Sequence, residues 1–187
     1  MCPKITEIET VSFTYPVDDA SMDPTAGKLV YSPGETYQRD AHGVRIITDT
    51  GLRGEYIGAT GVGLAQIDLC AEYLLGRDPL KREKHWDAMR QILRKYDQMG
   101  LGPVDIALWD LAGKHYGAPI HELLGTYRER LPAYASTYFA ERERGLDSPE
   151  AFADFAETCL DHGYPAFKTH TWTGEGPSDV RQAVELI

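Results

Sequence analysis

The segment from Pro103 to Ala112 constrains the fold of this chain most, because it is apolar on nearly every side of a helix. Its apolar side chains are Val104, Ile106, Ala107, Leu108, Trp109, Leu111 and Ala112. A helix that is apolar all round is normally a buried one, and a proline in its first turn lacks only an N–H that a helix start leaves unpaired. The sequence therefore predicts a buried helix that ends near Gly117, with other elements packed around it.

The chain before this helix begins with a predicted antiparallel meander. Its strands are expected at Ile5–Tyr15, Thr36–Thr48 and Arg53–Ile57. Pro16 should end the first strand, and Asp49-Thr50-Gly51 should form the turn between the other two. Residues 16–34 show no periodicity, so they are interpreted as a long loop. Two roles stay open for it: a functional lid or a disordered surface excursion.

Further helices are expected on both sides of the buried one. Apolar residues at a 3.6-residue period predict helices at 64–75 and 82–96, and a short turn of helix is expected at 120–124. The glycine-rich residues 58–63 lack the Gly-Lys-Ser/Thr ending of a phosphate-binding loop, so they are interpreted as a hinge or cap loop.

The pattern changes after residue 130 to strand, helix, strand, helix. Strands are expected at Leu131–Thr137 and Ala166–Trp172, with a helix between them and another at 177–187. Ser148-Pro149-Glu150 is typical of a helix start, with a capping hydroxyl, a first-turn proline and an acid. This order is that of a parallel sheet. Because two such strands do not make a stable sheet, we expect this sequence to be the front part of a longer protein.

Composition excludes several classes of protein. The chain has 187 residues and a formal net charge of −10, which argues against a general nucleic-acid binder. It has no run of about 18 apolar residues that could span a membrane, and residues 1–7 lack the apolar region expected of a signal peptide. Cys2, Cys70 and Cys159 are odd in number and widely spaced, so neither a disulfide framework nor a zinc site is expected. A cytoplasmic location is the default expectation.

Several stretches of the sequence resemble the enolase superfamily, most closely its mandelate racemase and muconate-lactonizing branch. The resemblance is carried by Gly100–Lys114, by Gly117–Gly125, by Leu131–Ser136 and by Leu75-Gly76-Arg77-Asp78-Pro79. It implies an α+β capping domain at 1–128, followed at 129–187 by the start of a (β/α)7β TIM-like barrel. It also implies that residues 16–34 and 56–63 cover the substrate, and that the protein is a homo-oligomer.

The same resemblance implies abstraction of a proton α to a carboxylate. Many members of the family use Lys-x-Lys at the end of the second barrel strand, and here Lys168 stands at the first position and His170 at the second. Histidine can act as a base near neutral pH, so Lys168 and His170 are the candidate catalytic pair. Lys168 would contact the substrate carboxylate and help keep His170 unprotonated. Alternatively, the essential base belongs to a later strand.

The remaining site candidates are weaker. Ser136 and Tyr138 follow the first expected barrel strand, where active sites of such barrels form, and they could equally be rim structure. Tyr31 and Tyr37 flank the end of the expected loop and could contact substrate or be surface aromatics. The resemblance implies Mg²⁺ as the cofactor, with acidic ligands expected beyond Ile187 and no metal ligand within this chain.

These expectations combine into one functional hypothesis with open alternatives. The favoured reaction is dehydration of a sugar acid, because a long polar cap loop and a Lys-x-His pair suit a hydroxylated acid better than an apolar one. Racemisation, epimerisation and cycloisomerisation remain alternatives within the superfamily. The partner is expected to be a small-molecule carboxylate rather than nucleic acid or membrane. The alternative of another class is a non-catalytic fragment or interaction module, if the chain truly ends at Ile187.

Overall fold

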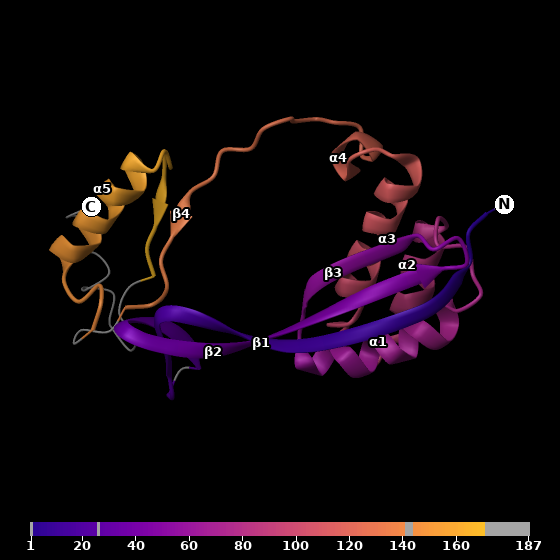
Figure 1. Cartoon of the computed structure of the whole chain (residues 1–187), viewed down its shortest axis with the longest axis horizontal. Coiled ribbons are helices and arrows are strands. Elements are labelled where there is room, and N and C mark those ends of the chain that lie inside the picture. The colour runs from indigo at the N-terminus through magenta and orange to yellow at the C-terminus, as the bar shows by residue number, and fades with distance from the viewer. Residues whose placement is uncertain (1, 26, 141–143, 171–187) are drawn as a thin grey trace. The chain divides into compact units, whose positions relative to one another are not determined.

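The computed structural model describes residues 2–25, 27–140 and 144–170 (Figure 1). In chain order its elements are β1 (Ile5–Asp23), β2 (Lys28–Thr48), β3 (Arg53–Ala59), α1 (Gly61–Leu74), α2 (Arg82–Ile92), α3 (Leu101–Tyr116), α4 (Ile120–Leu123), β4 (Ala135–Ser136), α5 (Pro149–Asp161) and β5 (Phe167–Lys168).

The described residues form two compact units. The first unit contains those of Met1–Tyr15 and Asp40–Glu129, and the second unit contains those of Pro16–Arg39 and Arg130–Ile187. The expected division of the chain into domains at 1–128 and 129–187 stays a prediction.

The predicted meander is present as a three-stranded sheet in the order β1-β2-β3. Strands β2 and β3 are antiparallel, with Val44 opposite Tyr56 and Ile46 opposite Gly54. The turn between them is closed by the Thr48 N–H, which donates to the Leu52 carbonyl over 3.0 Å. Val44 and Ile46 are buried in this register, so the hairpin turns an apolar face to the core.

The prediction of a long loop at residues 16–34 is wrong. Strand β1 continues past Pro16 to Asp23, and β2 already begins at Lys28. Strand β1 lies at the edge of its sheet, where a proline can be tolerated. The Gly34 N–H donates to Asp19 Oδ1 over 2.9 Å across this ribbon. The expected cap loop at 56–63 is also largely ordered, because β3 extends to Ala59 and α1 begins at Gly61.

Helix α3 packs against β3 in the core of the first unit, as its apolar composition predicts. Its buried residues include Val104, Ala107, Leu108 and Leu111. The helix is not buried all round, however, because 40 % of Ile106 is exposed. Trp109 is covered on one face by the Arg82 guanidinium, 4.0 Å from the ring centroid, so a cation replaces apolar packing there.

Helices α1 and α2 beside α3 lie where the sequence predicts them, although α2 is shorter than predicted. In α1 the Thr60 hydroxyl accepts from the Gly63 N–H, which caps the helix as a threonine at this position commonly does. Helix α2 ends at Ile92, not at Tyr96 as predicted. No helix in the described part of the chain is long and apolar enough to cross a membrane.

In the second unit, β4 and β5 pair in parallel, with α5 between them in the chain. The Ser148 hydroxyl accepts from the Ala151 N–H and Pro149 opens α5, as predicted. Phe152 lies in a small core with Ala140 and Leu146. Leu160, near the end of α5, lies outside this core and is 59 % exposed.

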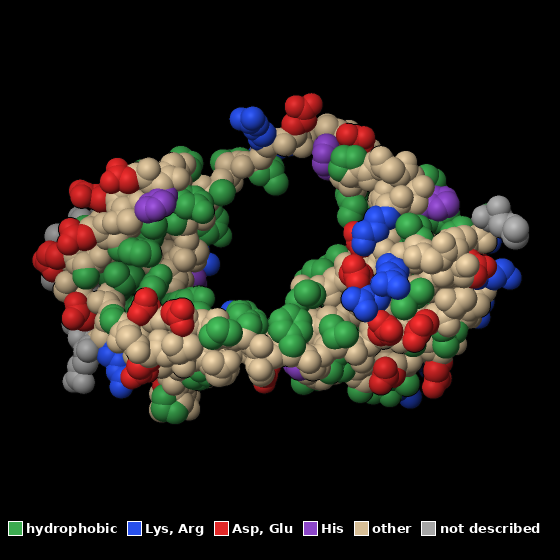
Figure 2. All heavy atoms as spheres, in the orientation of Figure 1, with side chains coloured by type: hydrophobic (Ala, Val, Ile, Leu, Met, Phe, Trp, Pro, Cys, Tyr) green, Lys and Arg blue, Asp and Glu red, His purple; other side chains and the backbone are tan. Residues whose placement is uncertain are grey.

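Both predicted strands of this unit are shorter than expected. Leu131 and Tyr134 were expected in the first of these strands, but they precede β4 and are 75 % and 56 % exposed. Their apolar side chains are therefore not packed in a core. Hydrophobic side chains are visible at the surface in several parts of the chain (Figure 2). Residues 171–172 of the second expected strand and the expected helix at 177–187 lie outside the described residues.

Candidate functional site

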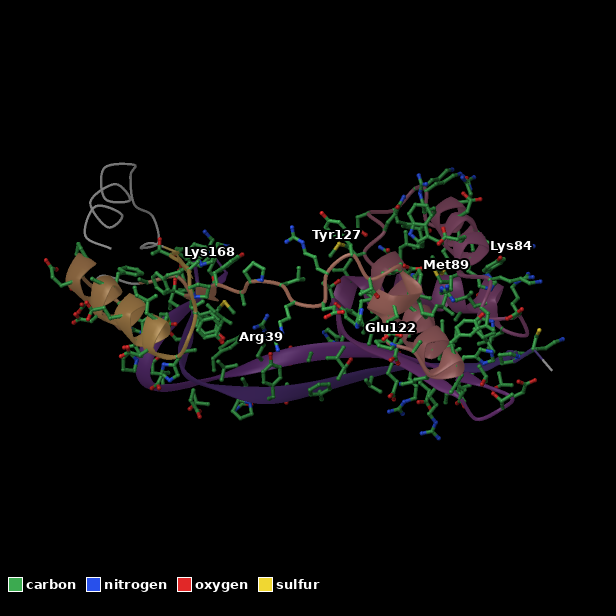
Figure 3. All side chains as sticks on the ribbon, turned by 90° about the horizontal axis from the view of Figure 1, so that it is seen from above. Arg39, Lys84, Met89, Glu122, Tyr127 and Lys168 are labelled. Carbon is green, nitrogen blue, oxygen red and sulfur yellow. The ribbon has the colours of Figure 1, made fainter. Side chains whose placement is uncertain are left out.

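The short parallel ladder of β4 and β5 brings two of the predicted site residues together. Ser136 lies opposite Lys168, and the Thr137 N–H donates to the Lys168 carbonyl over 3.1 Å. Both Ser136 and Lys168 have exposed side chains, and Figure 3 shows Lys168 at the end of β5. A primary ammonium and a hydroxyl in adjacent strands can bind a carboxylate and its neighbouring hydroxyl group.

His170 is held by Thr137 through two hydrogen bonds. The His170 backbone N–H donates to Thr137 Oγ1 over 2.9 Å. The imidazole Nδ1 lies 2.8 Å from the Thr137 carbonyl oxygen. A carbonyl oxygen can only accept, so Nδ1 must carry the proton in this contact. In the neutral ring Nε2 is therefore the nitrogen with a free lone pair, which a general base requires.

The imidazole also lies against an aromatic ring. The centroids of the His170 and Phe139 rings are 4.8 Å apart. The Lys28 Nζ lies 4.2 Å from the centroid of the same phenylalanine. Lys28 and Phe139 were not among the predicted site residues, because an aromatic and a lysine 111 positions apart give no local signal of their contact.

Tyr31 and Tyr138 form the second part of the site. Their ring centroids are 5.5 Å apart, and Tyr31 also contacts Phe155 edge to face at 5.9 Å. The Tyr31 N–H donates to the Phe139 carbonyl over 3.1 Å, so the backbone joins β2 to the segment after β4. Burial raises the pKa of the Tyr31 phenol, although a backbone hydrogen bond from Tyr138 acts in the opposite direction. The phenol therefore remains protonated at neutral pH.

Tyr37 is the predicted site residue that the structure does not bring into this group. It is half-buried in β2, and no ring contact or hydrogen bond among the described residues joins it to the other candidates.

Sequence reasoning also missed Arg144, which donates to Ser32 Oγ over 3.3 Å and pairs with Glu35 at 3.4 Å. Both Arg144 and Glu35 are about half exposed, so this ion pair contributes little to stability.

The described residues do not form a metal site. Within residues 2–25, 27–140 and 144–170, no group of three or more His, Cys, Asp or Glu side chains is placed to hold a metal ion. The donors around Lys168 are a hydroxyl, an ammonium and an imidazole, which do not fit a hard cation such as Mg²⁺ that prefers carboxylate oxygens. We therefore derive no chemical step through a metal from these residues.

Known proteins resemble this chain in both sequence and structure. D-galactarolactone cycloisomerase of Agrobacterium fabrum is 40 % identical over 112 residues, which are 55 % of this chain and 30 % of that protein. D-gluconate dehydratase of Thermoproteus tenax is 31 % identical over 161 residues, which are 77 % of this chain and 31 % of that protein. This chain thus spans about a third of the length of these curated relatives.

A solved structure matches over the whole chain. The crystal structure of D-glucarate dehydratase from Agrobacterium tumefaciens, complexed with magnesium, superposes with a TM-score of 0.85 at 29 % identity. The match covers 100 % of this chain and 50 % of the dehydratase chain.

A family model locates the resemblance in the sequence. Residues 35–125 match the N-terminal domain of mandelate racemase and muconate lactonizing enzyme. Together with the structural match, this places the chain in the mandelate racemase and muconate lactonizing enzyme branch of the enolase superfamily. The chain corresponds to the N-terminal part of such enzymes.

Proposed function

We propose that the full-length protein abstracts the proton α to the carboxylate of a sugar acid and eliminates water from it. The observation that carries the proposal is the arrangement of Lys168, the last residue of β5, and His170, two residues further on. Nδ1 of the histidine is occupied by the Thr137 carbonyl, and Nε2 is left to act as the base. The dehydratases among its relatives, which act on gluconate and glucarate according to their names, support the substrate class.

In the proposed step the Cα–H bond breaks and the proton passes to His170 Nε2. The electron pair of that bond delocalises onto the carboxylate, which the Lys168 ammonium binds. The electron pair then forms a Cα=Cβ bond as the Cβ–O bond breaks, and protonated His170 returns its proton to the departing β-hydroxyl, which leaves as water. The enol that remains tautomerises to the keto acid. Ser136, Tyr138 and Tyr31 are proposed to contact the hydroxyl groups of the substrate, because their hydroxyls can donate and accept.

Cycloisomerisation of a sugar-acid lactone is the second candidate. It is favoured by one observation, the 40 % identity to D-galactarolactone cycloisomerase over 55 % of this chain. Both reactions begin with removal of the same type of proton, so the residues described above would serve either. They differ in the product, which is a dehydrated keto acid in one case and an isomer of unchanged mass in the other.

The test is exchange of substrate α-protons for deuterium in D₂O, followed by NMR with the full-length protein. Sugar acids and their lactones are assayed with and without added Mg²⁺, and product masses separate dehydration from isomerisation. We expect exchange with at least one sugar acid, and a loss of about 100-fold or more in His170→Asn, since general bases contribute about that much. Absence of exchange with every acid in the presence of Mg²⁺ would contradict the proposal, and full activity of His170→Asn would remove His170 as the base.

A further inference from the structure

The ladder between β4 and β5 stops in an unusual way at His170. The Ala135 N–H donates to the Ala166 carbonyl, and the Thr137 N–H donates to the Lys168 carbonyl, as in a regular parallel pair. The next bond of this pattern would run from the His170 N–H to the Thr137 carbonyl. In the structure the His170 N–H donates instead to Thr137 Oγ1, and the imidazole Nδ1–H takes the carbonyl.

Because Thr137 Oγ1 accepts from the His170 backbone N–H, the Thr137 carbonyl remains available to accept from the imidazole. From this exchange of partners we infer that Thr137 is a positioning residue that fixes His170 in the Nδ1–H tautomer, with Nε2 as the basic nitrogen. Thr137 is 4 % exposed, and a β-branched side chain has few accessible χ1 angles. Oγ1 is therefore held in place to accept from the backbone, and water has little access to compete for the two bonds.

This inference rests on the proposed function for its catalytic meaning but not for its structural content. In free histidine the neutral ring favours the Nε2–H tautomer. In that tautomer Nε2 already carries a proton, so it could not accept the substrate proton in the proposed reaction. If the Thr137 hydroxyl were removed, the His170 N–H would take the ladder bond to the Thr137 carbonyl. The imidazole would then lose its acceptor and return to the tautomer of free histidine.

The tautomer can be measured directly by ¹⁵N NMR of histidine-labelled protein at a pH where the rings are neutral. The spectrum contains an internal reference of the opposite kind, because His85 Nε2 lies 2.7 Å from the Asp78 carbonyl oxygen and must carry the proton there. We expect protonated Nδ1 for His170 and protonated Nε2 for His85, with the His170 signal assigned by its loss in His170→Asn.

Two variants then test the role of the hydroxyl. Thr137→Val keeps the shape and the carbonyl but removes Oγ1, whereas Thr137→Ser keeps the hydroxyl. We expect Thr137→Val to shift His170 towards the Nε2–H tautomer and to lower kcat of the full-length protein about 10- to 100-fold, with a much smaller change in KM. Thr137→Ser should restore the Nδ1–H signal and most of the lost kcat.

The outcomes separate the inference from the function. Protonated Nε2 on His170 of the unaltered protein overturns the inference, as does Thr137→Val that retains both the Nδ1–H signal and full kcat. If Thr137→Val fails to fold, the tautomer of the unaltered protein and of Thr137→Ser still decides. If the NMR signals agree with the inference while no sugar acid exchanges its α-proton, the tautomer assignment is supported and the proposed function is wrong.

Discussion

The backbone at Gly54 in β3 lies directly against the carbonyl oxygen of Ala107 in α3, with no room for a Cβ atom. The close approach lets α3 pack its buried face onto the strand. We expect Gly54→Ala to destabilise the fold by about 1–3 kcal/mol through overpacking, as measured by urea denaturation. Gly102→Ala is the matched control, because Gly102 is exposed in α3 and has open space at its Cβ position.

The control has its own expected sign. Gly102→Ala should stabilise the protein by about 0.5–1 kcal/mol, since alanine reduces the entropy that a helical glycine loses on folding. Equal and small effects of both substitutions would contradict the close packing of β3 on α3.

Asp110 links the same two elements through its carboxylate. Asp110 Oδ2 accepts from the Glu55 backbone N–H over 2.8 Å and from Lys114 Nζ over 2.6 Å. Asp110→Ala leaves that N–H without its partner, and we expect a loss of about 1–2 kcal/mol in the free energy of unfolding. Lys114→Met removes two exposed ion pairs, with Asp110 and Glu55, and should cost under about 1 kcal/mol. A larger loss in Lys114→Met would show that the ion pairs dominate.

His85 makes stability depend on pH in one direction. Burial lowers its pKa from the ordinary value near 6.5, so below that pH the unfolded chain binds a proton that the folded chain does not. Stability should therefore fall as the pH drops below about 6.5, and the fall should continue until the lower pKa of the folded state is passed. The difference in unfolding free energy between pH 7.5 and 5.5 should be smaller in His85→Gln. An identical pH dependence in both proteins would contradict this.

The three cysteines should differ in reactivity. Cys2 is exposed, whereas Cys70 is fully buried and burial raises the pKa of its thiol to about 11. Since the thiolate is the reactive form, we expect one fast-reacting thiol in the native protein at pH 8 and further thiols only after denaturation. Cys2→Ser should remove the fast phase. A fast phase that persists in this variant would contradict the burial of the other cysteines.

Lys168 should act on substrate binding more than on the chemical step. Lys168→Met removes the ammonium proposed to bind the carboxylate, so we expect KM for a sugar acid to rise about 10- to 100-fold in the full-length protein, with a smaller effect on kcat. Steady-state kinetics check this, and Lys168→Arg, which keeps the charge, should recover part of the affinity. A large loss in kcat at unchanged KM would assign Lys168 to proton transfer instead.

Local patterns in the sequence were sufficient for most helices. Ser148 and Pro149 begin α5 as expected, because a capping hydroxyl and a first-turn proline act within a few residues. Gly163, with a φ of +89°, follows the end of the helix. Residues 16–34 were predicted to be a loop because they lack apolar periodicity, but they belong largely to β1 and β2. Two paired strands are held together by backbone hydrogen bonds and do not require that periodicity. Ile106 likewise appeared to be a core residue because composition does not show which side of a helix lacks a neighbour.

The sequence by itself determined the order of the described elements and the meander, because period and capping are properties of adjacent residues. Lys168 and His170 were singled out by the resemblance to the family. Only the tertiary structure decided that Thr137 holds His170 and that Tyr31 contacts Tyr138. Thr137 and His170 are 33 positions apart. Their hydrogen bonds form only once β4 and β5 are paired, and no local pattern encodes which carbonyl an imidazole will then reach.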